Sequence, residues 1–317
     1  MPQRTWTSAV ARELVAVTGL PDAQMAIRQL ARDALAEAEV EAAPVDLALV
    51  ASFQGVRAIE VAEMAQAGRL IPESGGYRIQ LNAGHSHRKR RFTTGHEIGH
   101  LLIPAYRSRP LPIEDLFTGQ FDTGREEEFL CDVAAAELLL PDDLFRPAAQ
   151  ACGCHLNAVL ELAARFDASR EATARRLVET NLWPCALVVW HQAYKKSEAS
   201  FALQSTLGLE WDPPQPKLRA RYAVASATFG HFIPAQLSAP RDRLLERCFA
   251  DGCPVSGEEV LRIGRREVPL YVMAVARNFV SAAGSTREVV SLLLSSVVVP
   301  EPHDAMPTLW DPSGTLD

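Results

Sequence analysis

The spacing of apolar residues divides the chain into a helix-rich first half and a strand-rich second half. Apolar positions recur three or four residues apart over residues 9–39, with an interruption at Gly19-Leu20-Pro21, and this pattern predicts two helices. A third helix is predicted from Arg125 to a stop near Pro141. Strand-like runs are predicted at residues 45–51, 56–61 and 77–81.

The pattern changes near Asn181. Two short predicted helices precede this point, 156–166 and 169–177, and their tight connection with Ser169 as N-cap resembles helix-turn-helix geometry. Hydrophobic strands then alternate with loops, which indicates an α+β domain. The predicted strands cover 186–190, 222–228, 268–275 and 289–299, and one helix covers 241–249.

The pentapeptide that runs from His96 to His100 contains the candidate chemistry. Histidines four residues apart lie on one face of a helix, so both imidazoles can reach the same zinc ion. Glu97 lies beside the first histidine and can act as the general base toward a water whose pKa the metal lowers. The preceding run, Arg91 to Gly95, offers a threonine as the helix cap. The motif therefore predicts a metalloprotease.

A catalytic zinc site usually has three protein ligands, so a third ligand is needed. The metzincin subclass is excluded because its third histidine position holds Tyr106. Glu128, Cys131, Asp132 and Ala135 share one face of the predicted helix at 125–141. We expect Glu128 to be the ligand, with Cys131 as the main alternative. Asp132 could hold a ligand imidazole, and the small Ala135 would allow two helices to pack closely around the ion.

Other residues of the same helix are predicted to have structural roles. Glu126 and Glu127 form an acidic first turn that complements the helix dipole. Glu137 lies on the side opposite Glu128, which favours a structural role for it as well. The predicted core positions are Leu130, Val133, Ala134 and Leu138 in this helix, and Ile98, Leu101, Leu102 and Ile103 in the motif helix.

These residues together resemble the ImmA/IrrE family of bacterial and phage metallopeptidases. The resemblance rests on Arg91-Phe92-Thr93 before the motif, on Glu128, and on the segment from Leu130 to Pro141; it covers roughly residues 45–180. It implies that His96, His100 and Glu128 bind the metal and that Glu97 is catalytic. Thr94-Gly95 stands where family members often have Leu-Ala, a difference that concerns local packing.

The resemblance also implies a fold, a partner and a domain order. We expect a zincin-like metallopeptidase domain with helix-turn-helix-like helices, followed by an α+β, GAF-like sensor domain. Family members typically cleave one XRE-type helix-turn-helix repressor and so derepress a stress-response or mobile-element regulon. The expected metal is Zn²⁺, although imidazole and carboxylate ligands also admit Mn²⁺. The predicted parts are 1–145 (metallopeptidase), 146–180 (helical segment), 181–300 (sensor domain) and 301–317 (flexible tail).

Composition agrees with a cytoplasmic enzyme of two units. The 317 residues are 48% hydrophobic and 22% charged, which suffices for ordinary globular cores. The first residues lack the apolar core of a signal peptide, and no run approaches the length of a membrane span. The net charge of −7 argues against a chain-wide nucleic-acid surface. The six cysteines lack the spacing of a zinc ribbon and are expected to be reduced.

One strongly basic segment, residues 85–91, precedes the motif helix. It could contact DNA or steer an acidic partner, but a solvated strand-to-helix loop is the favoured interpretation, with His85 and His87 exposed rather than ligands. Three hypotheses remain: a zinc endopeptidase, a DNA-binding regulator with a vestigial site, and a ligand sensor with a structural metal. Glu97 favours the first, because a structural zinc site would be closed by a fourth protein ligand.

Overall fold

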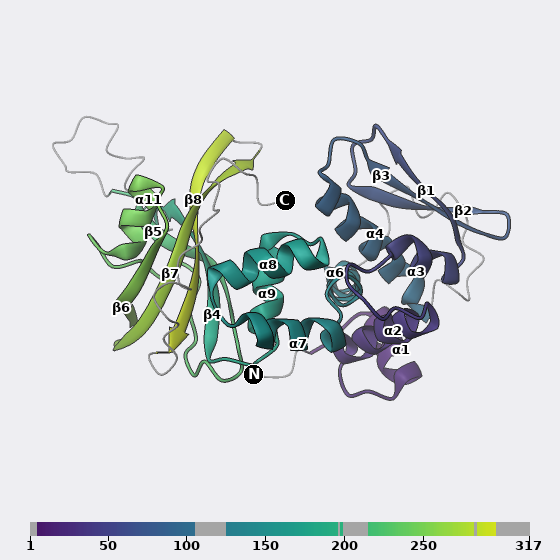
Figure 1. The fold of residues 1–317 in the computed structure, drawn as a ribbon, viewed down its shortest axis with the longest axis horizontal. Coiled ribbons are helices and arrows are strands. Elements are labelled where there is room, and N and C mark those ends of the chain that lie inside the picture. The colour runs from purple at the N-terminus through teal and green to yellow at the C-terminus, as the bar shows by residue number, and fades with distance from the viewer. Residues whose placement is uncertain (1–4, 105–124, 196, 199–214, 282–283, 296–317) are drawn as a thin grey trace. The chain divides into compact units, whose positions relative to one another are not determined.

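The computed structural model describes residues 5–104, 125–195, 197–198, 215–281 and 284–295 (Figure 1). They form two units, the first comprising residues 1–148 and 163–172 and the second 149–162 and 173 onward, within the described ranges. Part of the predicted loop at 211–216 and the whole predicted tail at 301–317 lie outside the described residues. Within the described ranges, no helix combines the length and apolar character needed to cross a bilayer.

The first two helices confirm the predicted interruption near Gly19. Helix α1 (Ala9–Thr18) starts at the N-cap Ser8, whose side chain accepts from the N–H of Ala11, and ends at Gly19 with a left-handed φ of 68°. Helix α2 (Ala23–Glu37) starts at Asp22, whose carboxylate accepts from the next turn of N–H groups. These caps explain why one long apolar pattern becomes two helices.

The strand predicted at 45–51 is wrong, because this segment forms helix α3 (Leu47–Phe53). Asp46 caps it by accepting from the N–H groups of Ala48 and Leu49. Leu47, Val50 and Ala51 are buried at the i, i+3 and i+4 spacing of a helix face. A short apolar run is ambiguous between strand and helix, and here the cap decides.

The first unit contains a three-stranded sheet in the order β1-β3-β2. The predicted strands β1 (Val56–Ala62) and β3 (Gly76–Asn82) pair in parallel, and β2 (Gly68–Glu73) pairs with β3 in an antiparallel hairpin. Strand β2 was not predicted, because it holds Gly68 and Pro72, which disfavour an interior strand. Among the described strands β2 and β1 are the edges, and β3 is central.

The motif helix α4 (His87–Leu102) begins earlier than predicted. Its N-cap is Ser86, whose side chain accepts from the N–H of Lys89, so the predicted threonine cap is wrong. The hydroxyls of Thr93 and Thr94 instead donate to the carbonyl oxygens of the residues four positions earlier, 3.0 Å away in each case. The segment predicted as a strand-to-helix loop is therefore largely the first turn of α4.

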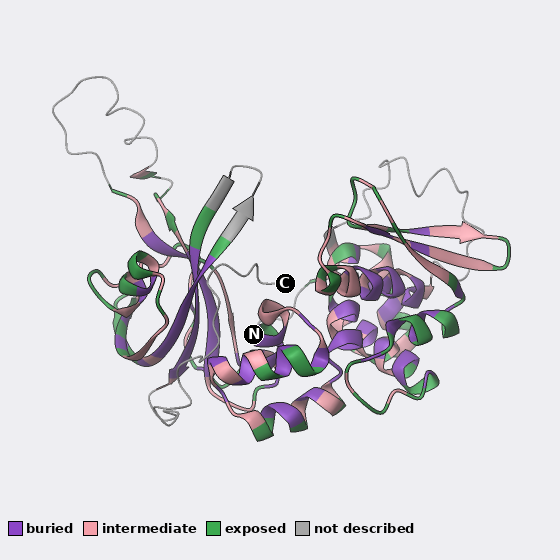
Figure 2. Cartoon of the chain, turned by 45° about the horizontal axis from the view of Figure 1, so that its top comes forward, coloured by how far each residue is buried: buried purple, intermediate pink, exposed green. Residues whose placement is uncertain are grey.

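Helix α6 (Arg125–Leu139) packs along α4 and matches the predicted span. All eight predicted core positions on the two helices are buried, and Figure 2 shows buried faces turned toward one another in this unit. Helices α7 (Asp142–Cys152) and α8 (Leu156–Phe166) each contribute to both units. Helix α9 (Arg170–Glu179) follows, and Ser169 accepts from the N–H of Ala172 at 3.1 Å as its predicted cap.

The second unit is built on a five-stranded antiparallel sheet in the order β5-β4-β8-β7-β6, which agrees with the expected α+β class. Its elements are β4 (Cys185–Ala193), β5 (Lys217–Ala225), α11 (Leu244–Asp251), β6 (Val255–Ile263), β7 (Arg266–Ser281) and β8 (Gly284–Ser295). Strand β6 was not predicted. Helix α11 packs on β6, β7 and β8, and its Leu245 and Cys248 enter a core formed with Trp190 and Leu293.

Candidate metal centre

Small residues let the motif helix and α6 approach closely. A Cβ atom on Gly99 would lie 3.1 Å from Cα of Cys131, and one on Gly95 would lie 3.2 Å from Cα of Ala135. Such distances are tighter than ordinary van der Waals contact, so these glycines and Ala135 set the separation of the two helices. The expected close packing at Ala135 is confirmed. It brings the side chains of α6 within reach of the histidines of α4.

His96 lies between two carboxylates of α6. Its Nδ1 is 2.9 Å from Oδ1 of Asp132, and its Nε2 is 3.1 Å from Oε2 of Glu128. Asp132 is thus in the position expected of a residue that orients a ligand imidazole. Burial alone would lower the pKa of His96, but the hydrogen bonds with Asp132 and Glu128 and the charge of Glu97 raise it to about 10. The surroundings therefore favour positive charge at this point, whether it comes from a proton or a metal ion.

His100 completes a ring of donor atoms. Its ring centre is 5.0 Å from that of His96, and its Nε2 is 3.8 Å from Oε1 of Glu128. Donor atoms bound to one zinc ion at ordinary lengths in a tetrahedron are about 3.4 Å apart. The distances from Glu128 to the two Nε2 atoms, 3.1 and 3.8 Å, lie on either side of that value. The Glu128 distances are thus close to those that one divalent ion requires, whereas the group among the described residues whose donor atoms all lie within 4.8 Å of one another is His96, His100 and Cys131.

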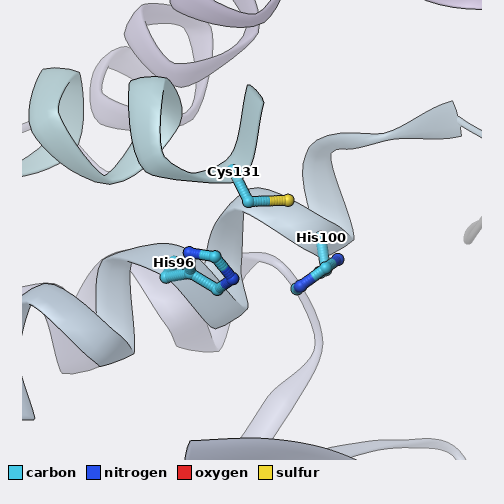
Figure 3. Close-up of side chains that lie close together, drawn as sticks. All are labelled: His96, His100 and Cys131. Atoms are coloured by element: carbon cyan, nitrogen blue, oxygen red, sulfur yellow. The ribbon is translucent and has the colours of Figure 1, made fainter. Parts of the chain in front are cut away.

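Cys131 also faces this point. Figure 3 shows its side chain on α6 near the imidazoles, and its sulfur lies within 4.8 Å of donor nitrogens of His96 and His100. Burial raises the pKa of the Cys131 thiol well above its ordinary value, and the charges of Glu127 and Glu128 add to this effect. In contrast, the hydrogen bond with His96 lowers the pKa of Glu128. A metal ligand must be deprotonated, but a bound ion itself removes the proton of a coordinating thiol, so both side chains remain candidates for the third ligand.

Glu97 is buried at the side of the site that faces β2. Only 7% of its surface is exposed, and burial raises its pKa although the two histidines oppose the shift. A Cβ atom on Gly68 of β2 would lie 3.2 Å from Oε1 of Glu97 and would collide with Cγ2 of Thr93. A larger residue at Gly68 therefore fits only if Thr93 moves, because β2 crosses closely over the turn of α4 that carries Glu97, and the sequence alone did not reveal this contact.

Three acidic residues of α6 have different structural partners. Glu126 accepts from the N–H groups of Thr7 and Ser8 at 3.1 and 2.8 Å. Glu127 is 4% exposed, and its Oε1 lies 3.4 Å from Nδ1 of His100. A role in the helix dipole alone does not account for these contacts. Glu137 is fully buried and forms ion pairs with Arg28 and Arg32 at 3.0 and 2.9 Å, so its predicted structural role is confirmed.

The basic segment before the motif is engaged within the first unit. Asp167 lies 2.6 Å from Nε2 of His87 and within 3.6 Å of Nε of Arg88, and its carbonyl oxygen accepts from Arg91 at 3.1 Å. Burial alone would raise the pKa of Asp167, but its bond to His87 and the nearby arginines lower it. Arg90 donates to the carbonyl oxygen of His85. These contacts favour a structural role for the segment over DNA binding.

Comparisons with known proteins agree with this geometry. A solved structure of a Mycobacterium tuberculosis transcriptional regulator superposes with a TM-score of 0.52 at 13% identity, over 94% of this chain and 86% of that one; this likeness concerns the fold alone. The radiation response metalloprotease IrrE of Deinococcus radiodurans is 30% identical over 171 residues, which are 53% of this chain. The match spans 51% of that relative, about half its length. Residues 54–178 match the peptidase M78 family, described as the IrrE N-terminal-like domain. This segment therefore resembles an IrrE-like metallopeptidase domain, and both comparisons support the expected relationship to the ImmA/IrrE family.

Proposed function

We propose that the chain is a zinc-dependent endopeptidase that cleaves a helix-turn-helix repressor of the XRE type in the cytoplasm and so derepresses a stress-response or mobile-element regulon. The observation that carries this proposal is the buried Glu97 carboxylate beside His96 and His100. A site with only a structural role has no use for a buried, unliganded base. The similarity to a radiation response metalloprotease supports the same class of activity.

The proposed ligands are His96, His100 and Glu128. Zinc is the favoured ion because two imidazoles and one carboxylate leave an open position, although the same donors admit manganese. Asp132 and Glu127 would orient the imidazoles through their Nδ1 atoms, 2.9 and 3.4 Å away. Cys131 remains the alternative third ligand, since its sulfur faces the same point.

The proposed mechanism assigns proton transfer to Glu97. When bound, zinc would supply Lewis acidity, which lowers the pKa of water and polarises the scissile carbonyl. Glu97 would take the proton of the attacking water and later deliver it to the leaving amine. Burial raises the pKa of Glu97 toward neutral pH. A carboxyl group with a raised pKa is suited both to accept a proton and to donate it again.

The edge strand β2 is the favoured place for an extended substrate. The strand that precedes Arg91, β3, cannot accept an added strand, because it is paired on both sides. Strand β2 has an open edge among the described strands, and Gly68 brings it against Glu97. A substrate segment that adds to β2 would gain main-chain hydrogen bonds and lie alongside the catalytic turn.

We assign the second unit a sensor role, with the GAF-like fold expected from the sequence. Its five-stranded antiparallel sheet and packed helix support an α+β sensor module. The alternative, a DNA-binding or ligand-sensing regulator whose metal site is not proteolytic, is less favoured. The basic residues that would contact DNA are engaged with Asp167 and neighbouring carbonyl groups.

The substitution Glu97→Gln tests the proposal, because it keeps the size of the side chain and removes the base. The chain is co-expressed with the helix-turn-helix repressor encoded beside its gene, or with candidate repressors of the same genome, and the repressor is followed by mass spectrometry. We expect one specific cleavage with the unaltered chain and none with Glu97→Gln, while bound zinc stays the same in both. Cleavage that persists in the variant would refute the mechanism.

A further inference from the structure

A half-open pocket of about 500 Å³ lies in the second unit, apart from the metal centre. Its lining comes from strands β4, β5 and β8 and from the end of α11, which all belong to the second unit (Figure 1). Its walls are formed by His191, Gln192, Arg221, Phe249, Thr286, Arg287 and Glu288. A volume of this size falls in the range of small-molecule sites.

The charge of this pocket is positive. Among the described residues that line it, Glu288 is the one acidic residue, and it is 2% exposed. Its Oε2 accepts from Arg277 at 3.0 and 2.7 Å, and its Oε1 accepts from Arg221 at 2.5 Å. Two guanidinium groups therefore offset one carboxylate, and Arg287 adds a third positive charge. An anion would be attracted to the pocket, and a cation would not.

Some hydrogen-bond donors in the pocket wall are not used by the described residues. Arg287 uses one nitrogen, Nη1, to donate to the carbonyl oxygens of Phe249 and Ala250, both at 2.8 Å. Its Nε and Nη2 make no hydrogen bond to the described residues. Nε2 of His191 is buried and likewise has no partner in the part of the chain that the structure describes. A buried polar atom without a partner is costly, but Nε2 of His191 is closed to solvent, so the donors open to a ligand are those of Arg287.

The arrangement of these donors suits a planar or tetrahedral anion. A guanidinium group binds carboxylate or phosphate oxygens through two parallel hydrogen bonds. Arg287 lies near the start of β8, a part of the strand that is exposed in Figure 2. The side of its guanidinium group that carries Nε and Nη2 is therefore open to a ligand from solvent. The ring of Phe249 supplies an apolar surface on the same wall. The pocket thus combines one anion-binding end with one apolar contact.

We propose that this pocket binds a small organic anion, whose carboxylate or phosphate group pairs with Arg287 and Arg221 and whose apolar part lies against Phe249. This pocket would be the ligand site of the proposed sensor domain. The biological meaning of the binding rests on that proposed role, but the binding itself does not. Binding can be measured on the full chain whether or not a repressor is cleaved.

The test is calorimetric titration of the full chain with four probes: inorganic phosphate, adenosine monophosphate, benzoate and the neutral benzamide. We expect at least one organic anion to bind with one-to-one stoichiometry and benzamide to bind at least about tenfold more weakly, because it lacks the charge-assisted pair. Binding of the phosphates alone would identify a phosphate ligand, and binding of benzoate alone a carboxylate. The proposal is overturned if no anionic probe binds.

Variants locate the binding site. Arg287→Gln and Arg221→Gln should each lower the affinity for the anion by about tenfold or more, because each variant loses one charge-assisted hydrogen bond. Arg221→Gln leaves Glu288 paired with Arg277, so the fold should persist, and its thermal unfolding is measured alongside. Arg266→Gln, an exposed arginine of the same unit outside the pocket, is the matched control and should bind normally. Equal affinity in all three variants would refute this site.

Discussion

Nδ1 of His100 lies 3.4 Å from Oε1 of Glu127, a buried carboxylate that is not among the proposed ligands. A carboxylate at this nitrogen fixes the ring orientation and increases the basicity of the opposite nitrogen. Glu127→Gln should therefore weaken zinc binding about 10- to 100-fold without removing a ligand. Competition with a fluorescent chelator measures the affinity.

The neighbouring glutamate is the control for this effect. Glu126→Gln changes the same charge one residue earlier, but its carboxylate contacts Thr7 and Ser8 rather than an imidazole. We expect Glu126→Gln to keep the zinc affinity of the unaltered chain. If both variants bind zinc alike, Glu127 acts only through overall charge or not at all.

A second comparison separates the two candidate third ligands. Glu128→Ala should reduce bound zinc from about one ion per chain to nearly none, because a two-histidine site lacks a third protein ligand. Cys131→Ala should keep the ion and lose some stability, since it removes a buried sulfur. Metal analysis of the purified variants decides the matter. Retained zinc in Glu128→Ala, with loss in Cys131→Ala, would assign the ligand to Cys131.

The contact between β2 and α4 predicts a defect that a second substitution should rescue. Gly68→Ala adds a methyl group that collides with Cγ2 of Thr93, so we expect a loss of about 1–3 kcal/mol in the free energy of unfolding and weaker proteolysis. Thr93→Ser removes that methyl group and keeps the hydroxyl that donates to Lys89. The double variant should recover most of the loss in thermal unfolding. Without recovery, the defect does not arise from this contact.

Acid should weaken the attachment of the first residues to α6. Hydrogen bonds from Ser8 and Thr7 lower the pKa of Glu126 from 4.5 to about 2. Because the folded-state pKa is the lower one, this stabilisation is complete above pH 4.5 and declines as the pH falls toward 2. The difference in melting temperature between the unaltered chain and Glu126→Gln should shrink over that interval. A difference independent of pH would contradict the assignment.

The histidine motif and the ligand face of α6 could be predicted because they depend only on the spacing of residues along a helix. Residues four apart on a helix share a face in any fold, so His96, His100 and the face of Glu128 follow from spacing alone. The same rule placed Asp132 on the face of Glu128. Its contact with His96, 2.9 Å away, comes from the packing of α6 on α4.

The errors concern features that depend on tertiary contacts or on weak local signals. Spacing separated Glu128 from Glu126 and Glu127, but only the packing of α6 gives Glu126 and Glu127 their different partners. Strand β2 contains Gly68 and Pro72, so its sequence argues against the strand that pairing with β3 produces. The helix at 47–53 resembles a buried strand until the cap at Asp46 is considered.

The contacts of Asp167 set a lower limit on the length of an independent protease fragment. Asp167 follows α8, yet it holds His87, Arg88 and Arg91 at the start of the helix that carries both histidines. A fragment that stops after α6 would contain all the proposed ligands and lack this anchor. A truncation near residue 145 would therefore leave the start of α4 free to fray, whereas one that extends through residue 172 would retain the whole first unit.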